Sequence, residues 1–245
     1  MKFPRCIPWF AWLLSFGTLV SVSAATNDYF DRGVACCRAG QFPEAAAAFQ
    51  SAASNRPAAG TLVNLGLAEW QRGHAGAAIV AWEQARWIDP RDAQANANLQ
   101  FAREVAQVDA PLLKWHETVS TWLPPNWWTW IAGASLWLAV GFVMLPGILR
   151  WRKATWHQAV AALCLMVFLL SVPAYAGLHT RLRLGFVLQP DTPLRMTPTL
   201  EAQALTRLQP GEPARAVRTR ANYVLIRTNR TQGWVEKAQF GLISQ

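Results

Sequence analysis

The sequence has few charged residues and few cysteines. Only 15% of its 245 residues are Asp, Glu, Lys or Arg, whereas 52% are hydrophobic. This composition argues against a single soluble globular domain. The four cysteines, at positions 6, 36, 37 and 164, have no Cys-x-x-Cys spacing, so we expect no metal site.

Familiar catalytic motifs are missing as well. The sequence contains no glycine-rich phosphate loop, no His-Glu-x-x-His helix and no Gly-x-Ser-x-Gly elbow. Its four histidines form no recognised motif with thiols or carboxylates. We therefore expect a protein that is not an enzyme and that uses no cofactor and no small-molecule substrate. The adjacent Cys36 and Cys37 leave a thiol redox protein as an alternative, although a disulfide between neighbouring residues is strained.

Charge is absent from two long stretches. Residues 127–149 and 156–178 contain no Asp, Glu, Lys or Arg. As helices each would be roughly 34 Å long at about 1.5 Å per residue, enough to cross a hydrocarbon core of about 30 Å. We predict two transmembrane helices. A buried helical hairpin of a soluble protein is the alternative, but soluble helices of this length normally have a polar stripe.

The loop between these stretches predicts their orientation. Residues 150–155 contain three cations and no acid, which the positive-inside rule places in the cytoplasm. Arg181 and Arg183, on the opposite side of the membrane, favour the reverse orientation. The three cations of the loop and the export signal are together the stronger evidence. Five tryptophans flank the stretches, as in an aromatic belt, namely Trp127, Trp128, Trp130, Trp151 and Trp156. We predict a bacterial inner-membrane protein with both mature termini outside the cytoplasm.

The N-terminus has the features of a signal peptide. Lys2 and Arg5 precede the uncharged apolar stretch 7–20, and small residues follow up to Ala25. We predict a signal peptide over residues 1–25, cleaved after Ala24 or Ala25. The alternative is an uncleaved first membrane helix, but the apolar stretch is shorter than the roughly 20 residues that a span needs.

An internal repeat follows the signal. Six anchors, Gly33, Gly40, Ala45, Phe49, Ala52 and Pro57, recur 33 residues later as Gly66, Gly73, Ala78, Trp82, Ala85 and Pro90. This order resembles the tetratricopeptide repeat, a pair of antiparallel helices. Cys36 and Glu69 replace the aromatic residue usual in the first helix of each unit. The resemblance covers residues 26–108, with residues 92–108 as a single capping helix.

In that family the first helices line a concave groove that binds a peptide or a helix. The resemblance places Phe30, Val34, Arg38, Val63, Leu67, Trp70 and Gln71 at the groove positions. The alternative is that several of them pack under the membrane-proximal segment. That segment, residues 109–126, contains three prolines and apolar residues at near-helical spacing, namely Leu112, Leu113, Trp115, Val119 and Trp122. We predict a short interfacial helix there.

Residues 179–245 change to short β-type stretches and carry ten basic and four acidic residues. We predict strands at 186–188, 193–196, 214–217, 223–227 and 233–235, closed into a small barrel. The segments 208–212, 223–227 and Gln232-Gly233-Trp234-Val235 resemble the bacterial SH3-like domain, which implies wall targeting or protein interaction. Trp234 is a candidate binding residue, with a core position as the alternative. The arginines would attract acidic lipids, anionic wall polymer or an acidic partner, and nucleic acid is not expected outside the cytoplasm.

The fold class is thus a multi-domain membrane protein with helical repeats, a two-helix hairpin and a small β-barrel. This module order resembles the BatE proteins of the bacterial aerotolerance operon. The resemblance implies von Willebrand A-domain proteins and a MoxR-type ATPase as partners in oxygen or envelope stress tolerance. We predict an extracytoplasmic scaffold, with a peptidoglycan-binding wall sensor as the alternative beside the thiol redox protein.

Overall fold

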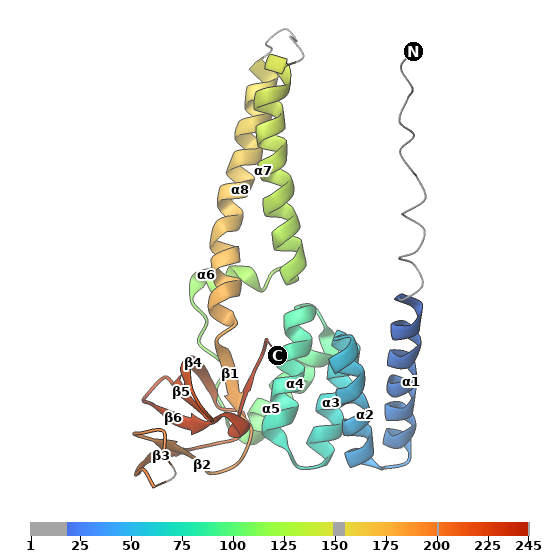
Figure 1. Cartoon of the computed structure of the whole chain (residues 1–245), viewed down its shortest axis with the longest axis vertical. Coiled ribbons are helices and arrows are strands. Elements are labelled where there is room, and N and C mark those ends of the chain that lie inside the picture. The colour runs from blue at the N-terminus through green and yellow to red at the C-terminus, as the bar shows by residue number, and fades with distance from the viewer. Residues whose placement is uncertain (1–18, 149–154, 200, 245) are drawn as a thin grey trace, which may run out of the picture.

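The computed structural model of the chain describes residues 19–148, 155–199 and 201–244. It has three parts, which are a layer of helices, a long helical hairpin that stands away from the rest, and an antiparallel sheet (Figure 1). Most of the predicted signal peptide and of the predicted cytoplasmic loop lies outside the described residues. The last residues of the predicted signal, 19–25, form the start of the first helix.

Five helices form the helical layer. Their bounds are α1 Leu19–Arg38, α2 Phe42–Asn55, α3 Ala59–Gln71, α4 Ala75–Ile88 and α5 Ala93–Ala106. Successive helices pack against each other. Gly40 and Gly73 have φ of 73° and 81° in the turns that follow α1 and α3, a conformation that glycine adopts without steric cost.

The 33-residue repeat of the sequence is also a repeat of contacts. A Cβ atom on Gly33 would overlap the ring of Phe49, and one on Gly66 would overlap the indole of Trp82. Both rings are buried, and Trp82 Nε1 donates a hydrogen bond of 3.1 Å to the carbonyl of Val63. Each glycine therefore makes room for the aromatic ring of the next helix, and the two helix pairs pack by the same rule.

The hairpin consists of α7, Pro125–Ile148, and α8, Thr155–Arg181, which pack along each other. Both helices are long and apolar enough to cross a membrane. Their apolar side chains are largely exposed, for example Trp137 at 76%, Leu163 at 60% and Leu170 at 67%. The hairpin is therefore not a buried core element of this chain, and its bounds agree with the two predicted spans to within a few residues.

The sheet has seven antiparallel strands in the order β3-β2-β6-β5-β4-β1-β7. Their bounds are β1 Leu184–Val187, β2 Thr192–Arg195, β3 Ala204–Leu208, β4 Pro213–Arg220, β5 Tyr223–Arg227, β6 Gln232–Glu236 and β7 Phe240–Leu242. All five predicted strands are present, and β3 and β7 are additional. Among the described residues no ladder joins β3 to β7, so the predicted barrel is not closed by hydrogen bonds.

The sheet and the helical layer share a core. Leu184 and Phe186 of β1, together with Ile243, belong to the same buried cluster as Phe49 and Trp82. The close approach of sheet and α4 depends on a glycine, because a Cβ atom on Gly76 would overlap the carbonyl oxygens of Val187 and Leu188. The two predicted domains therefore form one packed unit.

The short helix predicted within residues 109–126 is α6, Trp115–Ser120, at the base of the hairpin (Figure 1). It packs on α8, and a Cβ atom on Gly177 would overlap the backbone carbonyl oxygen of His116. Glu117 is fully buried, whereas Trp115 and Trp122 are 69% and 62% exposed. One side of this segment thus packs on the hairpin, while Trp115 and Trp122 remain exposed on the surface.

Candidate binding surfaces

The predicted groove residues lie on α1 and α3 but differ in exposure. Arg38, Leu67 and Gln71 are exposed. Phe30, Val34 and Trp70 are partly buried and pack on the core. Val63 is only 5% exposed, and its carbonyl accepts the Trp82 hydrogen bond. Val63 therefore belongs to the core, and its side chain offers no surface to a partner.

The exposed part of this face continues onto α5. Phe101 and Val105 are 54% and 59% exposed, and the Phe101 ring contacts Trp70 edge-on at 5.7 Å between centroids. Together with Leu67 and Trp70 they form what we call the α3–α5 patch. The sequence pattern of residues 92–108 predicts only a capping helix, so Phe101 and Val105 are not among the predicted binding residues. Their i, i+4 spacing was the signal that could have found them.

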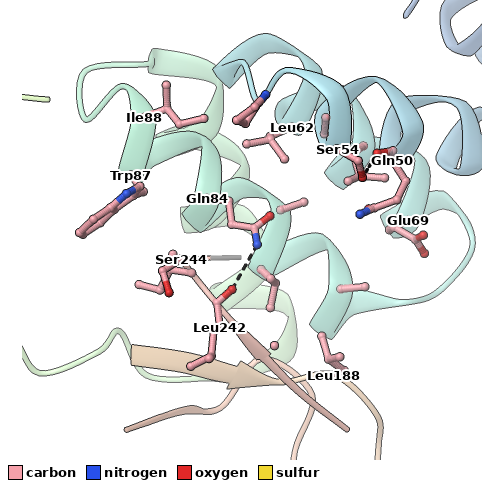
Figure 2. A pocket seen from close by; sticks show the side chains of 18 of the residues that line it. Gln50, Ser54, Leu62, Glu69, Gln84, Trp87, Ile88, Leu188, Leu242 and Ser244 are labelled. Atoms are coloured by element: carbon pink, nitrogen blue, oxygen red, sulfur yellow. Dashed lines mark hydrogen bonds between the residues drawn. The ribbon is translucent and has the colours of Figure 1, made fainter. Parts of the chain in front are cut away.

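A groove of about 660 Å³ lies between the helical layer and the sheet (Figure 2). Helices α2, α3 and α4 line one side, and β7 with the residues after it lines the other. Gln84 Nε2 donates a hydrogen bond of 3.1 Å to the carbonyl of Leu242, an edge-strand residue. None of the predicted site residues lines this groove, because it exists only where the two modules meet.

Glu69 and Gln84, two polar residues of this groove, already have structural partners. Glu69 accepts one hydrogen bond of 2.8 Å from Arg72 and pairs with His74 at 2.8 Å. Gln84 is bound to Leu242. Among the residues that the structure describes, no group of three or more His, Cys, Asp or Glu could hold a metal ion. The groove therefore offers shape and apolar surface to a ligand.

Trp234 lies on the outer face of the sheet rather than in its core. Along β6, Gly233 and Val235 are buried, whereas Trp234 is half-buried on the opposite face. The strand register places Trp234 beside Leu225 of β5 and Arg195 of β2. Arg218 of β4 pairs with Leu225. Arg195 is thus the direct neighbour of Trp234 on this face, and Arg218 lies one strand further away beyond Leu225, as suits an anionic or polar ligand.

Residues 189–240 match the bacterial SH3 domain family. No curated protein and no solved structure matched the chain. The match confirms the predicted C-terminal SH3-like domain, and such a domain suggests binding to protein or cell wall. It spans β2 to β6 but excludes β1 and most of β7, the strands that contact α4. The tetratricopeptide and BatE resemblances are supported by no match and stay predictions.

The SH3 domain is tied to the base of the hairpin by an ion pair. Arg215 of β4 donates to both carboxylate oxygens of Glu117 on α6, with Nη1–Oε1 at 2.7 Å and Nη2–Oε2 at 2.6 Å. Burial alone would raise the pKa of Glu117. The hydrogen bonds from Arg215, the Lys114 amide and Thr180 outweigh it and lower the pKa to about 2. Glu117 is therefore ionised at neutral pH and holds Arg215.

A second arginine connects the hairpin to the helical layer. The Arg181 guanidinium lies 4.8 Å from the centre of the Trp87 ring on α4. Its Nη1 donates to the Ser120 hydroxyl at 3.3 Å. Arg181, although it opposed the predicted orientation, thus has a structural role at the junction.

The thiol pair lies on α1 and is not bonded. Cys36 and Cys37 are free and partly buried. Burial, and then the neighbouring Cys36, raise the pKa of the Cys37 thiol. A raised pKa reduces the fraction of reactive thiolate at Cys37.

Proposed function

We propose that the chain is a membrane-anchored extracytoplasmic scaffold that holds partner proteins through its helical repeats and its SH3 domain. The observation that carries this proposal is the core shared by the helical layer and the sheet, which is fastened to the hairpin through Glu117 and Arg215. Binding modules that are fixed to each other and to an anchor keep their partners at a constant spacing. Such preorganisation lowers the entropy cost of assembling a complex.

The repeated contacts of Gly33 with Phe49 and of Gly66 with Trp82 support the assignment of α1 to α5 as tetratricopeptide repeats. The apolar hairpin supports placement in the bacterial inner membrane. The cationic loop supports an orientation with both mature termini in the periplasm.

The partner surface that we favour is the α3–α5 patch. Hydration of a contiguous apolar patch is unfavourable in free energy, and such patches are typical of interaction sites. By resemblance to the BatE proteins, the partners would be von Willebrand A-domain proteins and, through them, a MoxR-type ATPase of aerotolerance. The predicted Arg38 and Gln71 would add polar contacts at the rim.

This assignment predicts that two negative charges in the patch strongly reduce partner capture. The double variant Leu67→Glu with Phe101→Glu should recover A-domain protein from solubilised membranes at least about tenfold less efficiently, because desolvating a carboxylate opposes apolar contact. Mass spectrometry of affinity-purified full-length chain measures the recovery.

A matched control is the variant Ala47→Glu with Ser51→Glu, which adds the same charge on the exposed side of α2 and should bind normally. Equal recovery from both variants would argue against the patch. Absence of A-domain protein from the unmodified chain would argue against these partners.

The half-buried Trp234 on the outer face of the sheet, with Arg195 beside it, favours peptidoglycan binding as a second candidate function. The full chain should be tested in detergent, since an isolated SH3 domain would expose Leu184, Phe186 and Ile243 of the shared core. Cosedimentation with purified sacculi should weaken about tenfold on Trp234→Ala. Trp130→Ala, a change of an exposed hairpin residue, is the control. Lack of sedimentation of the unmodified chain would contradict wall binding.

A further inference from the structure

A second cavity, of about 380 Å³, lies where the hairpin meets the SH3 domain. We call it the base pocket. Its walls come from the start of α6 with Lys114 and Glu117, from the end of α8 with His179 and Thr180, and from the sheet. Arg183, Arg215 and Arg227 complete its polar lining. Three parts of the chain that are distant in sequence therefore converge on one small cavity.

The base pocket is strongly positive. Lys114, Arg183, Arg215 and Arg227 carry four permanent positive charges, and Glu117 is its one carboxylate. Glu117 is fully buried and occupied by Arg215 and the Lys114 amide. Within the described residues neither Lys114 nor Arg183 has an ion-pair partner. An excess of positive charge that is not neutralised within a cavity favours an anionic ligand.

The pocket lies at the end of the membrane-spanning stretch. The apolar part of α8 ends at Leu178, and the next residues line the pocket. Helix α6 is at the same level, because Gly177 packs against the backbone of His116. Trp115, Trp122 and Trp127 around this base are 69%, 62% and 60% exposed. Exposed tryptophans at the end of a span mark the depth of lipid headgroups.

We propose that the base pocket binds the phosphate-bearing headgroup of an anionic phospholipid in the outer leaflet. Arginine and lysine donate charge-assisted hydrogen bonds to phosphate oxygens, and lipid phosphates are concentrated at this depth. The pocket also accounts for Arg183 on the side of the membrane where the positive-inside rule disfavours it. The inference rests on the proposed membrane anchoring, and bound lipid would hold the SH3 domain against the bilayer.

The test uses full-length chain reconstituted in phosphatidylcholine vesicles with trace spin-labelled phosphatidylglycerol or phosphatidylcholine. Electron spin resonance gives the relative association of the two lipids with the protein. We expect a preference for phosphatidylglycerol that falls about fivefold per cation removed, in Arg183→Gln and further in Arg183→Gln with Lys114→Gln. Arg215 is left unchanged because it holds Glu117.

The control variant Arg220→Gln with Arg230→Gln removes the same charge from exposed positions of the sheet domain outside the pocket and should keep the preference. Survival of the preference in the pocket variant, or equal loss in the control, would overturn the lipid site. Displacement of the lipid by inorganic phosphate or by a hexaglutamate peptide would overturn it in favour of a soluble anion or an acidic partner. Failure of the chain to float with neutral vesicles would refute the anchoring itself.

Discussion

Replacing Arg215 with alanine should destabilise the full chain by about 3 kcal/mol. The substitution leaves the carboxylate of Glu117 fully buried without its partner, and removing one member of a buried ion pair is far more costly than losing an exposed one. It also removes the hydrogen bond to the Leu112 carbonyl. Urea unfolding in detergent measures the loss, and amide hydrogen exchange should rise in residues 112–120 and in β4.

The control is Arg218→Ala, on the same strand but exposed, which should change the free energy of unfolding by only a few tenths of a kcal/mol. Similar losses in both variants would mean that the ion pair does not hold the junction.

The same ion pair makes the free energy of unfolding fall as the pH is lowered. The pKa of Glu117 falls from 4.5 to about 2 on folding, so the folded state binds fewer protons than the unfolded state between these values. The stabilisation is complete above pH 4.5 and is lost as the pH falls towards 2, by about 3 kcal/mol in total. Glu117→Gln should lack this acid-dependent loss in urea unfolding, and an unchanged profile would assign the loss to other groups.

Gly76→Ala should destabilise the junction of sheet and helical layer by about 2 kcal/mol or more. In a helix this change normally stabilises, but here the new methyl group would overlap the carbonyl oxygens of Val187 and Leu188. Backbone atoms cannot rotate away as a side chain can, so β1 must move off α4. Hydrogen exchange of β1 and β7 together with thermal unfolding measures this separation.

Gly60→Ala is the matched control, because no atom lies within 4 Å of its Cβ position. It should be neutral or slightly stabilising. If Gly76→Ala behaved like Gly60→Ala, the sheet would not be packed on α4 as described. The proposal of a rigid scaffold would then lose the observation on which it mainly rests.

Elements with a strong local pattern were predicted well. The 33-residue repeat led to α1–α4, and uncharged stretches led to α7 and α8. The strands β5 and β6 were found because apolar and polar residues alternate in them. β3 was missed because four of its five residues are exposed, which leaves no alternation, and β7 was missed because only three residues form it.

The candidate sites were predicted only in part. Leu67 and Trp70 lie in the α3–α5 patch that we propose as the partner surface, whereas Val63 is a core residue and Phe101 is not among the predicted residues. Trp234 was recognised by its motif, whereas its position beside Arg195 follows from strand register. The two cavities were beyond prediction because each is lined by segments of different modules.

The sequence alone determined the helical N-terminal region, the apolar hairpin and the SH3 domain, because each is specified by the periodicity or composition of neighbouring residues. Tertiary structure alone decided that these parts form one unit with a basic pocket at the base of the hairpin. Glu117 and Arg215 meet although they are 98 residues apart, and α4 receives β1 at Gly76. Contacts of this kind depend on the shapes of surfaces that are distant in sequence, and local sequence patterns do not predict them.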